Sequence, residues 1–269
     1  MIRPTAVAGT WYPGTAGALT REVDDYLKAA SDGPRGELTA IIAPHAGMMF
    51  SGPVGAYSYK ATASRQFDVA VLVGPSHFVA FEGAALWPDG GFDSPLGVAP
   101  IDDAVARALA EHAIVKPMSS AHQREHSLEM QLPFIRHLAP RAQIVPLVMG
   151  YQTAETSRAL GDAVAEVLRS RPGSLLVAST DLSHYHDAAT AAQLDAVVID
   201  CVARFDTDGL QAALDRQPEH ACGGGPTVAV MHAAKLLGAR GAVVLNHADS
   251  SAVSGDRSAV VGYMAAAFA

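Results

Sequence analysis

Three apolar segments of this chain each lead to a histidine a few residues later. These pairs of segment and histidine are 41–43 with His45, 69–73 with His77, and 174–179 with His184. Short apolar runs bounded by Gly, Pro or Ser are typical of buried strands. In open α/β sheets, ligands bind beyond the carboxyl ends of the strands. We therefore expect the three histidines to share one pocket at one edge of a sheet.

The pattern of apolar residues predicts alternating strands and helices along the chain. Expected strands cover 38–43, 68–74, 82–87, 143–149, 174–179, 241–247 and 258–266; expected helices cover 16–30, 53–63, 102–114, 154–170, 188–204, 207–216 and 227–237. Residues 88–100 are predicted to be loop, and Pro53 is placed in the first turn of its helix. With no linker composition or repeat, this alternation predicts one α/β domain over residues 1–269. Its central sheet is expected to be largely parallel or mixed and flanked by helices.

Composition excludes several classes of protein. The formal net charge is −8 and the basic residues are scattered, so we expect no nucleic-acid surface. No apolar stretch approaches the roughly 18 residues of a membrane span, and the N-terminus does not have the pattern of a signal peptide. The only cysteines, Cys201 and Cys222, do not form a disulfide framework. We expect a cytoplasmic protein that acts without a membrane.

Cys222 lies among glycines directly before a predicted helix. The helix dipole and free amides at such a position favour a thiolate, which can be a nucleophile or a metal ligand. A small buried cysteine beside a tight turn is the alternative. Cys201 lies on an apolar helical stripe, where a packing role is expected. The run Gly-Gly-Gly-Pro at 223–226 could also cradle an anion.

The histidines at the strand ends favour a metal site with open positions. Neutral imidazole is the commonest protein metal ligand, and His45 and His77 occupy matching positions. Two imidazoles and one anionic group on one face of a metal are typical of non-haem iron sites. A structural zinc site would instead need four closed ligands with short Cys spacings, which are absent.

Other polar residues near these positions are candidates for acid–base or substrate roles. Asp181 could orient an imidazole or cap a turn, and His184 could be a general base. His126 could contact a substrate, whereas Glu125 is equally explained as an acid at a helix start. A cysteine hydrolase using Cys222, His184 and Asp181 remains open. A Ser-His-Asp hydrolase is disfavoured, because no Gly-x-Ser-x-Gly elbow occurs. Dinucleotide and P-loop fingerprints are also missing.

Several motifs together resemble the Memo family, whose prokaryotic members are also called AmmeMemoRadiSam system protein B. They are Gly-Thr-Trp-Tyr-Pro at 9–13, Pro-His-Ala-Gly at 44–47, Gly-Pro-Ser-His at 74–77, Glu-His-Ser-Leu-Glu at 125–129, Ser-Thr-Asp-Leu-Ser-His at 179–184, and Cys-Gly at 222–223. The resemblance covers nearly the whole chain in the right order. It implies a fold shared with class III extradiol dioxygenases of the LigB type.

The resemblance also implies roles for individual residues. His45 and His77 match two histidine ligands and Cys222 matches the third ligand, with thiolate in place of carboxylate. Asp181, His184 and His126 match polar residues of the family's pocket. Met48 and Met49 stand where an aromatic residue is expected in many relatives, so they are expected to form part of a substrate-binding wall.

These observations together predict a mononuclear metalloprotein with oxygenase-type or related redox chemistry on a small organic substrate. Fe(II) is the expected ion, with Zn or Cu as alternatives, and a thiolate ligand alters the redox properties of the metal relative to the dioxygenases. The other hypothesis is a non-catalytic metal-binding or peptide-binding accessory protein. By resemblance, its partners would be AMMECR1-like and radical-SAM proteins.

Overall fold

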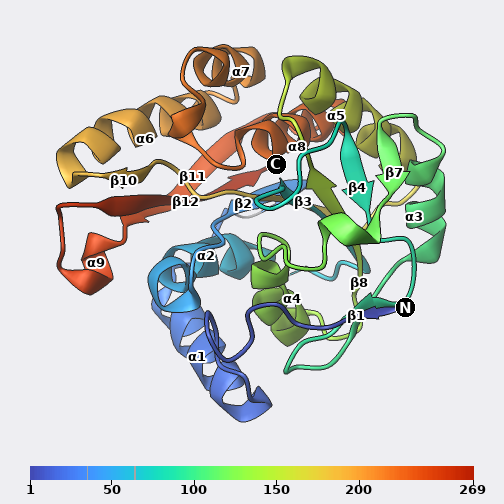
Figure 1. Ribbon diagram of the computed structural model, residues 1–269, viewed down its shortest axis with the longest axis horizontal. Helices are drawn as coiled ribbons and strands as arrows, with labels where there is room; N and C mark the ends of the chain where they lie inside the picture. The colour runs from blue at the N-terminus through green and yellow to red at the C-terminus, as the bar shows by residue number, and fades with distance from the viewer. Residues whose placement is uncertain (35, 64) are drawn as a thin grey trace.

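Over residues 1–34, 36–63 and 65–269, which the computed structural model describes, a nine-stranded mixed sheet runs through the molecule (Figure 1). Its strands are β2 (Ala40–Ala43), β3 (Val69–Pro75), β4 (Ala84–Leu86), β7 (Val115–Pro117), β8 (Gln143–Met149), β9 (Ser174–Ser179), β10 (His184–His186), β11 (Ala242–Asp249) and β12 (Val260–Phe268). Their order is β10-β12-β2-β9-β3-β8-β4-β7, and β11 also pairs with β12. Strands β2, β9, β3 and β8 are mutually parallel, so their carboxyl ends meet at one edge.

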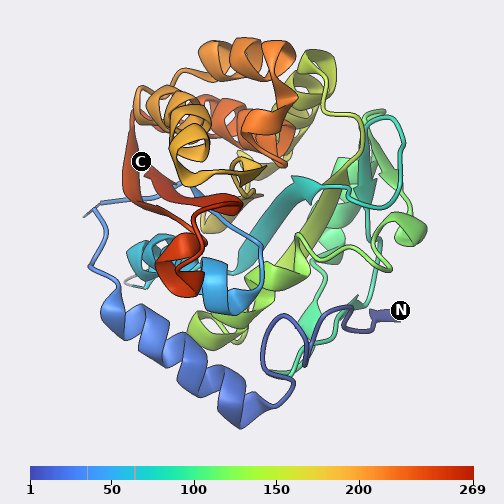
Figure 2. The same ribbon diagram turned by 60° about the vertical axis from the view of Figure 1, so that its left-hand side comes forward.

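Helices cover both faces of this sheet (Figure 2). They are α1 (Ala16–Ala29), α2 (Met48–Thr62), α3 (Asp103–Ala110), α4 (Leu132–Leu138), α5 (Ala154–Leu168), α6 (Ala188–Ala203), α7 (Thr207–Arg216), α8 (Gly224–Leu236) and α9 (Ser251–Ser254). Helices α1, α2 and α4 lie on one face, and α5, α7 and α8 lie on the other. A small sheet of β1 (Ile2–Arg3), β5 (Gly91–Phe92) and β6 (Ala99–Pro100) lies at the side. None of the helices in the described ranges has the length and hydropathy needed to cross a bilayer.

The central strands are apolar because both of their faces are covered. Every residue of β2 and β3 is buried, and parallel strands covered on both sides have continuous rather than alternating apolar sequence. This burial explains why β3, β8 and β9 could be predicted from short apolar runs. The predicted α/β class, with a mixed sheet flanked by helices, is confirmed.

The prediction for α2 is wrong at its start. The helix begins at Met48, and Pro53 lies inside it rather than in its first turn. The first turn is closed by other contacts, since Met48 N donates to Trp11 O at 2.8 Å and Ser51 N donates to Gly47 O at 3.1 Å. The bond to Trp11 is a tertiary contact that the proline pattern cannot predict. It starts the helix three residues after His45. The predicted loop at 88–100 is also only partly correct, because it contains β5 and β6.

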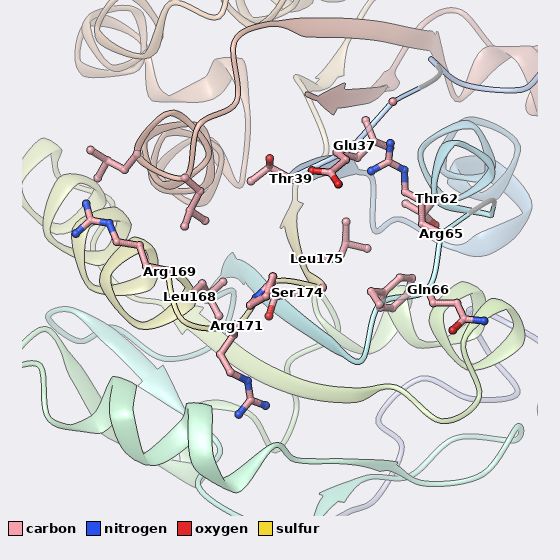
Figure 3. A pocket seen from close by; sticks show the side chains of 17 residues that line it. Glu37, Thr39, Thr62, Arg65, Gln66, Leu168, Arg169, Arg171, Ser174 and Leu175 are labelled. Carbon is pink, nitrogen blue, oxygen red and sulfur yellow. The ribbon is translucent and has the colours of Figure 1, made fainter.

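A cavity lies at the opposite edge of the sheet from the histidines. Its volume is about 610 Å³, and loops at the amino ends of β2, β3 and β9 line it (Figure 3). Arg65 and Arg169 follow the carboxyl ends of α2 and α5, where cations complement the helix dipole. Arg171 donates to the buried carboxylate of Asp102. Since no histidine or cysteine is among the described residues that line it, this cavity is not the site indicated by the sequence.

A buried ion pair holds the N-terminal strand against the segment that precedes α4. Arg3 Nη1 donates to Glu129 Oε2 at 2.6 Å, and neither side chain is accessible to solvent. Arg3 Nε also donates to His122 O at 2.6 Å, and its Nη2 donates to Glu125 O. The Glu129 carboxylate accepts three further bonds, from Ala6 N, Val7 N and the hydroxyl of Tyr12.

Removing one partner of this pair should destabilise the protein strongly. We expect Arg3→Ala to lower the free energy of unfolding by about 3–5 kcal/mol, because it leaves the Glu129 carboxylate buried without a countercharge. The control Arg158→Ala breaks an exposed pair with Asp208 and should cost less than about 1 kcal/mol. Urea unfolding followed by circular dichroism measures both values. Equal costs for the two variants would contradict the importance of the buried pair.

Candidate metal centre

The carboxyl edge of the sheet brings together His45, His77 and Cys222. His45 lies two residues beyond β2, His77 lies two residues beyond β3, and Cys222 lies two residues before α8. One potential ligand atom from each side chain lies within 4.8 Å of the other two. Cys222 Sγ is 3.2 Å from His45 Nε2. Zn–N and Zn–S bonds of about 2.0–2.3 Å place neighbouring ligand atoms roughly 3–4 Å apart, so the three side chains fit a metal ion.

Hydrogen bonds set the tautomer of His45. The Ser179 hydroxyl donates to Ser127 O at 2.6 Å and accepts from Gln131 Nε2 at 2.8 Å. Its single proton is therefore used, and it must accept from His45 Nδ1, which lies 2.9 Å away. This leaves the lone pair on His45 Nε2, the atom that faces Cys222. Burial, with the nearby imidazole of His77, lowers the pKa of His45 well below its usual value, so the ring is neutral.

The carboxylate of Glu125 orients His77. Its Oε1 lies 2.9 Å from His77 Nδ1, and its Oε2 accepts from His77 N at 2.6 Å. His126 N and Ser127 N also donate to Oε1. Burial alone would raise the pKa of Glu125, but these bonds outweigh it and lower the pKa to about 2. The ionised carboxylate can only accept, so His77 Nδ1 carries the proton and Nε2 is free to bind a metal.

His77, Glu125 and His126 form a second group whose potential ligand atoms lie close together. The Glu125 oxygens are occupied by the four N–H bonds described above. A metal ion there would have to displace the proton of His77 Nδ1 and break this arrangement. The group is therefore better explained as support for His77 than as a second metal site.

Of the two alternatives for Cys222, the structure does not provide the free helix N-terminus that would favour a thiolate. Cys222 N donates to Asp181 O at 3.2 Å, and Gly223 N donates to Thr180 Oγ1 at 3.0 Å. These amides are not free to cradle an anion. Burial and the charge of Asp181 raise the pKa of the Cys222 thiol far above its usual range. Without a metal ion, the side chain is a thiol with His45 Nε2 in hydrogen-bonding range.

His126 lies beside the cluster on its open side. Its ring stacks on that of His77, with centroids 4.5 Å apart, and it meets the Trp11 ring at 4.4 Å. Burial lowers the pKa of His126 to about 4, so its ring is neutral at pH 7. The His77 side chain is 27% exposed, whereas that of His45 is 2% exposed. Solvent therefore reaches the cluster past His77, beside the half-exposed rings of Trp11 and Phe78.

Asp181 and His184 do not act as a pair. Asp181 Oδ1 accepts from His45 N at 2.7 Å and from Ala46 N at 3.3 Å. Burial raises the pKa of Asp181 to about 7 despite these bonds. His184 Nδ1 instead lies 2.8 Å from Leu182 O, so it is the protonated nitrogen and Nε2 is free to accept. Asp181 therefore holds the backbone around His45, and of the imidazoles it is His45, with Nε2 4.0 Å from Asp181 Oδ2, rather than His184 that lies beside it.

The structure does not support two further expectations, a substrate-binding role for Met48 and the cysteine hydrolase. Met48 is 1% exposed and packs in the main core, so it is not part of a substrate wall, whereas Met49 is 56% exposed. The cysteine hydrolase arrangement is not formed, because the imidazole in contact with Cys222 belongs to His45 rather than His184. The sequence also gave no reason to select Ser179 or Gln131, since their roles depend on contacts between distant segments.

Fold and geometry together define an α/β protein with two histidines and one cysteine gathered at the carboxyl ends of its strands. A family model described as Memo-like protein matches residues 3–267. The MEMO1 family protein of Nitrosopumilus maritimus is 33% identical over 276 residues and 100% of both chains. That of Ignicoccus hospitalis is 35% identical over 281 residues, covering 100% of this chain and 99% of its own. The chain belongs to the Memo family.

A solved structure shows a similar fold. The uncharacterized protein JW3007 from Escherichia coli K12 matches with a TM-score of 0.60, covering 86% of this chain and 99% of its own. The sequence identity is 16%, so this likeness concerns the fold alone.

Replacing Glu125 should release the imidazole of His77. In Glu125→Gln, we expect the His77 ¹⁵N shifts to report a mixture of tautomers rather than a protonated Nδ1, because the ionised acceptor is lost. The unfolding free energy should fall by about 1–3 kcal/mol, since buried N–H groups lose their acceptor. Long-range ¹H–¹⁵N spectra of the metal-free protein measure the tautomers, with Glu111→Gln, at an exposed position, as control. A variant in which His77 keeps one protonated Nδ1 would contradict this role of Glu125.

Proposed function

We propose that the protein is a mononuclear metalloenzyme whose ion is held by His45, His77 and Cys222. Iron(II) is the ion we favour, and the proposed activity is oxygen-dependent or related redox chemistry on a small organic molecule. The observation that carries this proposal is the convergence of the three ligand atoms within 4.8 Å, supported by hydrogen bonds that leave Nε2 of each imidazole free. Three protein ligands leave open positions on the metal, as in sites where two His and a carboxylate hold iron.

When bound, the metal supplies redox and Lewis-acid chemistry, and the chain supplies orientation and proton transfer. Ser179 holds the His45 ring and Glu125 holds the His77 ring, so neither imidazole has to reorient for binding. Burial lowers the pKa of His184, which leaves the ring neutral with Nε2 unprotonated and free to accept a proton. His126, neutral and half-enclosed by Trp11, is placed to contact a substrate that enters past His77.

Loss of either imidazole or of the sulfur should abolish metal binding. Mutation of residues that are hydrogen-bonded to metal ligands typically weakens metal binding by roughly 10–100-fold. We expect a larger loss of Fe(II) affinity in His45→Ala, His77→Ala and Cys222→Ala, because each removes a ligand itself. Elemental analysis and metal titration of anaerobically purified protein measure this. His247→Ala, at an exposed position on β11, should bind as the wild type does. Full metal occupancy in any of the three ligand variants would refute the assignment of that ligand.

His184 should affect turnover without affecting metal binding. In His184→Gln, we expect oxygen consumption with catechol-like aromatic compounds to fall by about 10²–10⁴-fold, the usual range for a lost general acid or base. Metal stoichiometry should stay unchanged. His186→Gln, on the same short strand but near Glu219, should retain activity. An unchanged rate in His184→Gln would overturn the acid–base role of His184.

The same assay tests the alternative of a non-catalytic accessory protein. Stoichiometric metal without oxygen consumption would favour metal-dependent binding to AMMECR1-like or radical-SAM partners. Copurification with those partners would then be the next measurement.

A further inference from the structure

The segment that carries Cys222 is held from several sides. Close packing leaves no room for side chains at the three glycines that follow the cysteine. A Cβ at Gly223 would lie 2.4 Å from Ser179 O, and one at Gly224 would lie 2.5 Å from Leu214 Cδ2. The glycines therefore serve close backbone approach rather than flexibility.

Gln152, which follows β8 in the chain, is hydrogen-bonded to the segment that carries Cys222. The residue lies three positions beyond that strand, in the loop before α5. Its Nε2 donates to Cys222 O at 2.7 Å, and its Oε1 accepts from Gly225 N at 2.7 Å. Its side chain also occupies the space beside Gly225, where a Cβ would lie 2.7 Å from Gln152 Cβ. One carboxamide thus satisfies a carbonyl just before α8 and an N–H within its first turn.

The hydrogen bonds of Gln152 lie beside a cavity that water can enter. A cavity of about 260 Å³ lies beside the cysteine segment, and Tyr151, Gln152, Asp215, Pro218 and Cys222 are among its lining residues. Gln152 is half-buried and lines this cavity together with Cys222. If its amide were absent, water could reach Cys222 O and Gly225 N, and the segment would lose its attachment to the sheet edge.

We propose that Gln152 is a positioning residue for the cysteine ligand. This inference rests on the proposed metal site. The carboxamide contacts neither Sγ nor the imidazoles, and it acts by fixing the backbone that carries Sγ to the same sheet edge as His45 and His77. Metal ligands need placement within about 0.5 Å of their productive position. Bonds to Cys222 O and to Gly225 N, three residues apart, restrict both translation and rotation of the cysteine backbone.

Two substitutions separate the bond from the packing. Gln152→Glu keeps the shape of the side chain and the acceptor for Gly225 N, but it places a carboxylate oxygen against Cys222 O. Gln152→Ala removes both bonds. The matched control is Gln193→Glu, at an exposed position on α6, which makes the same charge change away from the site.

The first measurement is a Co(II) titration of the metal-free protein, followed by the sulfur-to-cobalt charge-transfer band. We expect both Gln152 variants to bind Co(II) about 10–100-fold more weakly and to show a weakened or shifted band, with Gln193→Glu unchanged. Wild-type affinity together with a wild-type band in both Gln152 variants would overturn the proposal.

The second measurement needs no metal. The rate of iodoacetamide labelling of Cys222, separated from Cys201 by peptide mass spectrometry, should rise at least ~10-fold in Gln152→Ala, because local opening of the segment becomes easier. An unchanged labelling rate in both variants would refute the positioning role, even if wild-type protein failed to bind Co(II). Failure of wild-type protein to bind Co(II) or Fe(II) would instead refute the proposed metal site. Circular dichroism establishes that each variant is folded before labelling.

Discussion

The arrangement of the site depends on the four N–H groups that donate to the carboxylate of Glu125. A buried carboxylate is costly unless it is fully hydrogen-bonded, and these bonds come from the loop after β3 and from residues 126 and 127. They join two segments about fifty positions apart and fix the ring of His77. The pair of Arg3 and Glu129 holds the same stretch from the N-terminal side, through Arg3 contacts to the carbonyls of His122 and Glu125. The N-terminal strand is therefore part of the support of the site.

The two imidazoles reach the same state by different means. His77 is oriented by an ionised carboxylate, whereas His45 is oriented by a hydroxyl whose proton is already used. In both cases Nδ1 is the donor and Nε2 keeps its lone pair. Carboxylate–histidine pairs of this kind orient the imidazole in zinc enzymes. The Ser179 hydroxyl is neutral, so the two rings have acceptors of different charge on Nδ1.

The sequence predicted those features that depend on local pattern. The strands that precede His45, His77 and Asp181 could be predicted because parallel strands buried on both faces have continuous apolar sequence. The role of Glu125 was missed, because acids are common in first helical turns and its partner His77 lies in the distant loop after β3. The start of α2 was predicted too late from Pro53, because the contact between Met48 and Trp11 that begins the helix is tertiary. Cys222 was expected to be a thiolate because the sequence cannot show that the amides before α8 already have acceptors.

The cluster is closed on one side and open on the other, and this asymmetry separates support from access. On the closed side, Gly223 packs against Ser179 at the end of β9, Gly224 against Leu214 of α7, and Gly225 against Met149 at the end of β8. On the open side, His77 faces solvent beside Trp11 and Phe78, whose segments supply none of the hydrogen bonds that orient His45. Trp11 and Phe78 therefore border the path by which a molecule could approach the cluster. A change on the closed side moves the sulfur itself, because each of its glycines is already in contact with backbone or side-chain atoms.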